Sequence, residues 1–262
     1  MLVFSYELDI KPHLSRYWLN TTETDPVQFE AEVRQVCELY AQTPQLAAQG
    51  VHVISTDEMT GIQALERTAA TKPVKAAPNG YPVARLEFEY TRHGTITLMC
   101  NLEIATGRIV SPTLHPTRTE ADYVTHIQRL VATDPEAHWI ILSDRLNTHH
   151  SASLVEWVAA TLQLEDDLGE KGKSGILGDM TSRYSFLSDP THRISFRHTP
   201  KHSSWLNQIE IWFSILVRKL LKRSSFKSVE ALRERILAFI GYYNAVLAKP
   251  FAWTYKGKPL QL

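Results

Sequence analysis

The stretch from Thr119 to Leu164 reads TEADYVTHIQRLVATDPEAHWIILSDRLNTHHSASLVEWVAATLQL. Its first part spaces apolar residues at helical steps, with acids in the first turn where the helix dipole favours them. Residues 138–143 form a short apolar run typical of a buried strand, and residues 151–164 return to helical spacing. A helix, a strand and a helix in succession predict a sheet covered by helices.

The elements on either side of this stretch follow from apolar spacing and turn residues. On the N-terminal side we expect a helix, a strand, an irregular loop and a β-hairpin, at 26–43, 51–56, 60–83 and 86–102. On the C-terminal side we expect a strand and two long helices, at 194–197, 201–223 and 228–248. The predicted fold class is therefore α/β, a mixed β-sheet flanked by helices.

This order of elements suggests three parts. Residues 1–45 form an N-terminal linker and helix, residues 46–225 form the central α/β domain, and residues 226–262 form a C-terminal helix and basic tail packed on the core. Residues 165–190 are charged and rich in glycine, so we interpret them as an insertion or mobile loop within the central domain.

Charge is divided unevenly along the chain. Residues 1–170 carry 12 Lys and Arg against 23 Asp and Glu, whereas residues 171–262 carry 16 against 5. A basic C-terminal third favours a polyanionic partner, because neutralising phosphates releases counterions. Attraction between the two halves of the chain explains the same pattern equally well.

Composition limits the compartment and the chemistry. The two cysteines, Cys37 and Cys100, are too few for a disulfide framework and match no zinc-binding spacing. The N-terminal apolar run is too short for a signal peptide, and no later run is long enough to cross a bilayer. We therefore expect a cytoplasmic protein with no membrane partner.

Three acidic residues lie where functional side chains of α/β proteins gather. Asp57 and Asp144 each end an apolar, strand-like run, and strand ends and the loops after them commonly carry functional residues. Glu210 lies within an apolar helical run, where an ionised carboxylate is costly to bury unless it is paired or holds a metal. The core-facing side of that helix is predicted to comprise Trp205, Ile209, Trp212, Phe213 and Leu216.

Three convergent carboxylates would provide hard oxygen ligands. Such ligands suit Mg²⁺ or Mn²⁺ rather than zinc, and two such ions can support phosphoryl transfer without a nucleophilic side chain. Each acid also has a structural interpretation. An Asp after a strand is most often a turn or cap residue, and Glu210 has Arg218 and Lys219 within reach for a salt bridge.

Neighbouring polar residues leave further alternatives open. Glu58 would point to the opposite face from Asp57 and is expected at the surface or behind the site. His149 and His150 are either metal ligands or exposed loop residues. We also name candidate DNA contacts, although dipole compensation at a helix end explains some of them. They are Arg145, Lys201, His202, Asn207, Arg218, Lys219, Lys222 and Arg223.

Three segments together resemble a known family. They are STDEMTGIQALER (55–67), ILSDRLNTHHS (141–151) and HTPKHSSWLNQIEIWFSILVRKLLKRSSF (198–226), which are similar to bacterial insertion-sequence transposases related to the mariner superfamily. The resemblance implies a ribonuclease-H-like catalytic core in which Asp57, Asp144 and Glu210 form a DDE triad holding two Mg²⁺ or Mn²⁺ ions. It also implies cleavage at transposon ends, joining to target DNA, and a homodimer on double-stranded DNA.

The chain departs from that family in three places. Arg145 stands where relatives commonly have Asn, and Glu210 follows Asp144 by 66 positions, a longer spacing than usual. Relatives begin with helix-turn-helix modules, so we expect this chain to be the catalytic half. Two other functions stay open, a catalytically silent form that binds DNA or inhibits the full-length enzyme, and a ribonuclease-H-like nuclease without strand transfer.

Overall fold

The computed structural model describes residues 26–256 apart from six positions. Those positions are Thr71, Pro78, Asn79, Leu86, Asp166 and His202. The prediction that His202 contacts DNA, and those for residues 1–25 and 257–262, therefore lie outside the described residues.

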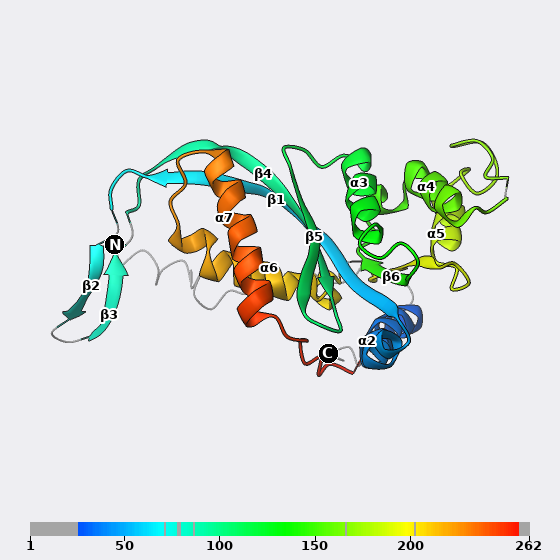
Figure 1. Cartoon of the computed structure of the whole chain (residues 1–262), viewed down its shortest axis with the longest axis horizontal. Coiled ribbons are helices and arrows are strands. Elements are labelled where there is room, and N and C mark those ends of the chain that lie inside the picture. Colours follow the sequence, from blue (N-terminus) through cyan, green and yellow to red (C-terminus); the bar gives the residue numbers. More distant parts are fainter. Residues whose placement is uncertain are drawn as a thin grey trace, which may run out of the picture.

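A five-stranded mixed sheet forms the centre of the structure, in the strand order β5-β4-β1-β6-β7 (Figure 1). Its strands are β1 (Val51–Arg67), β4 (Tyr90–Glu103), β5 (Arg108–His115), β6 (His138–Ser143) and β7 (Ile194–His198). The β1–β4 and β4–β5 pairs are antiparallel, whereas the β1–β6 and β6–β7 pairs are parallel. The predicted mixed sheet is confirmed.

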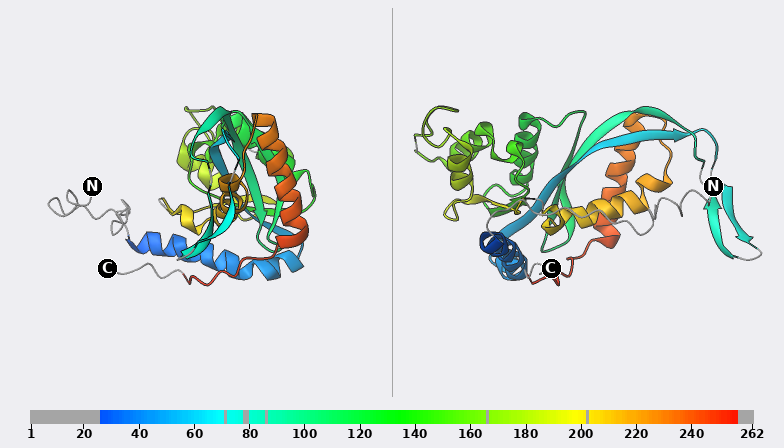
Figure 2. Two further views of the ribbon diagram at one scale, coloured as in Figure 1. Left: turned by 90° about the vertical axis from the view of Figure 1, so that its left-hand side faces the viewer. Right: turned by 180° about the vertical axis from the view of Figure 1, so that it is seen from behind.

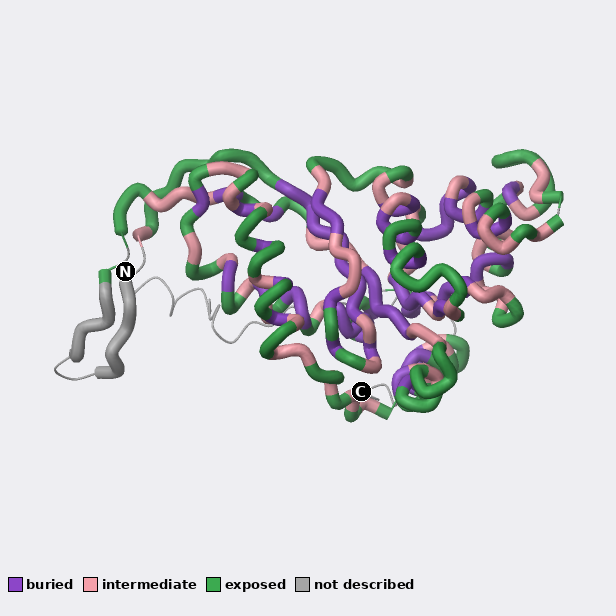
Figure 3. Tube along the Cα trace, viewed as in Figure 1, coloured by how far each residue is buried: buried purple, intermediate pink, exposed green. Residues whose placement is uncertain are grey.

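Helices cover both faces of this sheet, because successive strand residues point to opposite sides. One core contains Val53 and is covered by α2 (Pro26–Ala48), α6 (Ile209–Lys219) and α7 (Val229–Tyr242). The other core contains the next residue, Ile54. Its helices are α3 (Glu120–Val131), α4 (Ala152–Leu162) and α5 (Met180–Leu187). Figure 2 shows α7 beside the sheet and α2 crossing beneath it, and Figure 3 shows buried residues concentrated along the central strands.

Shorter elements connect these layers. Three are 3₁₀ turns, η1 (Asn147–His150), η2 (Ser204–Leu206) and η3 (Leu221–Arg223), and a π turn, η4 (Tyr243–Leu247), extends α7. Strands β2 (Lys72–Ala77) and β3 (Gly80–Arg85) pair in a separate two-stranded sheet between β1 and β4. The predicted irregular loop over 60–83 is therefore wrong.

The predicted boundaries of β1 and β4 are also wrong, for one physical reason. Gly61 and Gly94 suggested a loop and a hairpin turn, yet both lie inside long paired strands. Their φ angles of 65° and 115° occur where the β1–β4 register shifts, which marks β-bulges. Glycine adopts this backbone without strain, so each bulge bends the strand without ending it.

Strand β5 was missed because its sequence contains a similar interruption. Ser111 has a φ of 45° and precedes Pro112, where the β4–β5 register shifts. Proline is tolerated in an edge strand or a bulge, and β5 is both an edge strand and bulged.

Two C-terminal predictions also need correction. Residues 165–190 include α5 and contribute Leu177 and Leu187 to a core, so this segment is not a loop throughout. The predicted helix over 201–223 is divided into η2, α6 and η3, because Asn207 is extended and ends η2. As a result Trp205 is half exposed and packs edge-on against Tyr255, while the other four predicted core residues of this segment are buried.

Candidate active site at the ends of β1 and β6

Asp57 lies just beyond the parallel part of the sheet. The β1–β6 pairing ends at Ser55, whereas β1 continues against β4 and pairs Asp57 with Cys100. The Asp57 carboxylate accepts hydrogen bonds from its neighbour's backbone N–H (2.7 Å) and from Asn207 Nδ2 (3.2 Å). Burial, and then the charge of Asp144, raise the pKa of Asp57 to about 7. Asp57 therefore shares a site with a second carboxylate, although β1 does not end there as predicted.

Asn207 fastens the start of α6 to β1. Its Nδ2 also donates to the Thr56 carbonyl (2.9 Å), and its Oδ1 accepts from the Ser55 hydroxyl. The same hydroxyl accepts from the Ile209 backbone N–H (2.9 Å). The Asn207 side chain is fully buried, so it lies inside the protein holding Asp57 and does not lie on a DNA-facing surface as predicted.

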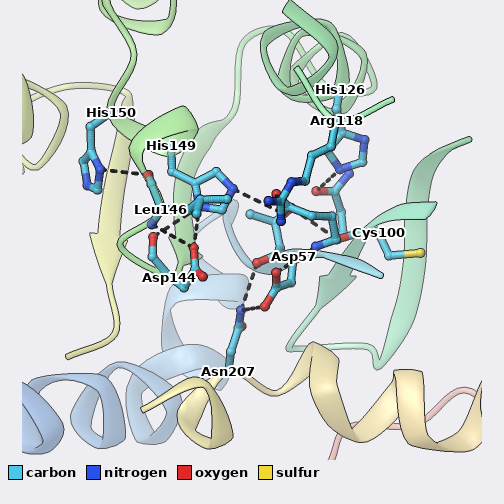
Figure 4. Close-up of polar contacts among 12 residues, drawn as sticks. Asp57, Cys100, Arg118, His126, Asp144, Leu146, His149, His150 and Asn207 are labelled. Carbon is cyan, nitrogen blue, oxygen red and sulfur yellow. Dashed lines mark hydrogen bonds and ion pairs between the residues drawn. The ribbon is translucent and has the colours of Figure 1, made fainter. Parts of the chain in front are cut away.

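Asp144 follows the last residue of β6 and is held by η1. Its Oδ1 accepts from the Leu146 backbone N–H (3.0 Å) and lies 2.7 Å from His149 Nδ1 (Figure 4). Burial opposes ionisation of this carboxyl, but the hydrogen bond and charge of His149 outweigh burial and keep its pKa below the usual value. Asp144 is thus a carboxylate with one oxygen firmly held.

His149 is buried between two acids. Its Nε2 lies 3.2 Å from Glu58 Oε2, on the opposite side of the ring from Asp144. Burial disfavours the charged ring, but the hydrogen bonds to Asp144 and Glu58 dominate and raise the pKa of His149 to about 10. His149 is therefore not an exposed loop residue, and Glu58 is buried behind the site. His150 is also buried, and burial lowers its pKa to about 4.

Glu210 lies in the first turn of α6 and is partly exposed. Burial, and then the charge of Asp144, raise its pKa. Among the described residues no ion pair involves Glu210, and the Arg218 guanidinium instead donates to the Ser214 carbonyl (3.1 Å). The alternative salt bridge with Arg218 or Lys219 is absent from this part of the chain.

The charge of Asp144 raises the pKa of both Asp57 and Glu210. Within residues 26–256, at the positions described, no three His, Cys, Asp or Glu side chains are grouped closely enough to hold one ion together. The donor set nevertheless fits Mg²⁺ or Mn²⁺, because it consists of carboxylate oxygens and like charges that a cation would stabilise.

The predicted basic contacts fall into two groups. Arg145 forms an ion pair with Glu32 of α2 (2.6 Å) and packs over the Tyr184 ring, so its guanidinium is engaged within the protein. The other predicted basic contacts with a described side chain are exposed. They lie between the loop before α6 and η3. These are Lys201, Arg218, Lys219, Lys222 and Arg223.

A comparison with protein families decides the identity. Residues 52–233 match the family described as DDE superfamily endonuclease, which covers most of the chain. The chain belongs to the DDE endonuclease superfamily. A search of curated proteins finds no match.

Solved structures show the fold of this DDE protein. The Mos1 mariner paired end complex with Mn matches with a TM-score of 0.50 and 11% identity, covering 91% of this chain and 65% of that one. The catalytic domain of Mos1 mariner transposase matches with a TM-score of 0.47 and 12% identity, covering 86% and 85%. The match at a TM-score of 0.50 confirms the predicted ribonuclease-H-like fold. In the described part of the chain, no helix has the length and apolar character needed to span a bilayer.

Sequence reasoning missed three residues that support the acids. Asn207 was assigned to a helix and to DNA, while Glu58 and His149 were left between surface and site. The available signal was the polar sequence itself, because Asp57-Glu58 directly follow one apolar strand and the His149-His150 pair lies in the loop after the other. Only the structure shows that Glu58 and His149 meet.

Proposed function

We propose that this protein is the catalytic part of a DNA transposase, which cleaves DNA at transposon ends and joins them to target DNA. The observation that carries the proposal is the shared position of Asp57 and Asp144 just beyond the β1–β6 pairing, in a chain of the DDE endonuclease superfamily. The central domain, residues 46–225, would carry this chemistry, with α2 and α7 packed against it.

Asp57, Asp144 and Glu210 would hold Mg²⁺ or Mn²⁺, with two ions as the proposed number. Such ions activate an attacking oxygen and stabilise the leaving oxygen in phosphodiester chemistry. The protein's own contribution is to keep Asp57 and Asp144 in place through Asn207 and His149. Glu210 approaches from α6, an element on a different layer, so the site spans the sheet and one helix.

The exposed basic side chains from Lys201 to Arg223 are the proposed phosphate contacts. They lie on the loop before α6, at the end of that helix and on η3. Lysine and arginine at these positions would bind double-stranded DNA largely independently of sequence. By analogy with the Mos1 paired end complexes, we propose that two copies act together on DNA.

A plasmid assay with Mg²⁺ or Mn²⁺ tests the proposal. Asp57→Asn, Asp144→Asn and Glu210→Gln should each abolish metal-dependent cleavage. Glu230→Gln is the matched control for the glutamate, because Glu230 is also in the first turn of its helix and is exposed. Unchanged cleavage in all three site variants would refute the proposal.

A second candidate is a catalytically silent DNA-binding form. It is favoured by the absence of a three-residue metal group among the described positions. DNA binding by the unaltered protein without metal-dependent nicking would support it. Nicking without joined products would instead indicate a nuclease that lacks strand transfer.

A further inference from the structure

The buried side chain of His149 connects Asp144 with Glu58, which lies on the face of β1 opposite to that of Asp57. His149 contacts Asp144 Oδ1 through Nδ1 at 2.7 Å and Glu58 Oε2 through Nε2 at 3.2 Å. The side chain of His149 is 0% exposed and that of Glu58 is 3% exposed. Figure 4 shows the His149 ring directly beside the Asp144 carboxylate. Solvent therefore cannot substitute for either contact.

These contacts fix the direction of the imidazole ring. Each ring nitrogen of His149 lies within hydrogen-bonding distance of a carboxylate oxygen, which can accept a hydrogen bond from it. The Tyr123 ring lies against the imidazole with a centroid distance of 4.2 Å, and Arg118 lies 3.7 Å from the other oxygen of Glu58. His149 Nδ1 also lies 3.2 Å from the main-chain carbonyl of Asp144, so turning the ring would break its contacts with both carboxylates and with that carbonyl.

Among the described residues, His149 is the side chain that contacts the Asp144 carboxylate. Asp144 lies beyond the end of β6, and its side chain is 36% exposed. Its Oδ1 has one other hydrogen bond to a described residue, from the Leu146 backbone, and its Oδ2 has none within the described residues. His149 thus holds one oxygen of Asp144 and leaves the other available.

We propose that His149, oriented by Glu58, is a positioning residue that holds the Asp144 carboxylate ready to bind a divalent cation. This inference rests on the proposed function, since it assumes that Asp144 is a metal ligand. Partners behind a ligand orient it, and their loss typically weakens metal binding about 10- to 100-fold.

The experiment measures Mn²⁺ affinity of the full chain without DNA, from the electron paramagnetic resonance signal of free Mn²⁺. Two substitutions test the two ring nitrogens of His149 separately. His149→Asn places an amide nitrogen near Nδ1 and keeps the donor to Asp144, whereas His149→Gln places it near Nε2 and keeps only the donor to Glu58. Glu58→Gln replaces one carboxylate oxygen with an amide nitrogen, which keeps the shape of the side chain and removes its charge.

The positioning role predicts a graded result. His149→Gln should weaken Mn²⁺ binding about 10- to 100-fold, Glu58→Gln should weaken it less, and His149→Asn should retain most of the affinity. His126→Gln is the matched control. His126 is equally buried and bonds Thr113 and Asn101 through its two ring nitrogens, without contacting either aspartate.

Melting temperatures of all variants separate positioning from structural support. If His149→Gln does not fold, the contrast between Glu58→Gln and His126→Gln gives the answer. Asp57→Asn supplies the reference for the site itself. If Asp57→Asn loses Mn²⁺ while folded His149→Gln and Glu58→Gln bind as tightly as the unaltered protein, the positioning role is overturned and the proposed metal site stands. If Asp57→Asn also binds Mn²⁺ normally, the proposed site fails and the positioning role fails with it.

Discussion

The two faces of β1 hold the two aspartates in different ways. On the α6 face, Asp57 is held by the neutral amide of Asn207, which is itself bonded to Ser55 and Thr56. On the α3 face, Asp144 is held by the imidazole of His149 with Glu58 behind it. The amide network ties a helix to a strand, whereas the histidine network orients a single side chain. We therefore expect damage to the first to affect stability most, and damage to the second to affect metal binding most.

The largest expected effect comes from removing an aspartate. A unit charge about 4 Å from another is worth roughly 4 kcal/mol near a protein surface, which corresponds to about 10³-fold in affinity. Asp57→Asn and Asp144→Asn should therefore each weaken Mn²⁺ binding by about that factor, measured by calorimetric titration. Glu210→Gln should weaken it less, because Glu210 is partly exposed and its side chain lacks the ion pairs and hydrogen bonds that hold Asp144. An equal loss in all three variants would remove the distinction between the strand and helix parts of the site.

The next effect concerns the α6 face. Asn207→Ala leaves the Ser55 hydroxyl and the Thr56 carbonyl without their side-chain partner, and each unpaired buried group costs about 1–3 kcal/mol. The free energy of unfolding in urea should fall by about 2–6 kcal/mol. Asn244→Ala is the control, because the side-chain amide of Asn244 makes two hydrogen bonds with the Ile109 backbone, away from the acids. Only the Asn207 variant should also lower Mn²⁺ affinity, and an equal effect in both variants would show that Asn207 has no special link to Asp57.

The third effect is a pH dependence on the α3 face. Burial lowers the pKa of His126 to about 3, and it lowers the pKa of His198 well below the usual value. Because the unfolded chain takes up these protons near pH 6.5 and the folded chain does not, the contribution of these two histidines to stability is fully present above that pH and falls as the pH decreases. The loss per histidine is about 1.4 kcal/mol per pH unit below 6.5.

Hydrogen exchange at pH 7.5 and pH 5 measures where this loss occurs. Amides of α3 should lose protection before those of α6, and His126→Gln should reduce the pH dependence of unfolding. Uniform loss of protection across both faces would contradict the assignment of acid sensitivity to the α3 face.

The smallest effect concerns the exposed basic side chains. Each phosphate contact removed should reduce the salt dependence of DNA affinity by about one unit of slope. Lys222→Ala and Arg223→Ala are expected to do so, measured by fluorescence anisotropy over a range of salt concentrations. Lys173→Ala is the control, because Lys173 forms an exposed pair with Glu170 far along the chain from η3. A similar change in Lys173→Ala would show that the effect reflects net charge alone.

The sequence predicted the sheet class and β6 accurately because these depend on local apolar patterns. Residues 138–143 were identified to the residue, and the apolar side chains of α6 gave its buried face. The lengths of β1 and β4 were not predictable in this way, since Gly61 and Gly94 have the same local signature in a bulge as in a turn. Only the pairing of the two strands distinguishes these cases.

The acids of the candidate site were predicted, whereas the residues that hold them were not. Asp57, Asp144 and Glu210 stand out because each charge adjoins an apolar run. Asn207 and His149 gain their roles from contacts across 150 and 91 positions of sequence, to Asp57 and Glu58 respectively. No local pattern encodes such contacts, so a buried histidine and an exposed one look alike in sequence.

The most direct test of the central claim is the position of a bound cation. Crystals of the full chain soaked in Mn²⁺ can be measured by anomalous diffraction, which locates manganese without reference to activity. We expect an anomalous peak between the carboxylates of Asp57 and Asp144. Anomalous density elsewhere, or none at a concentration that supports cleavage, would contradict it.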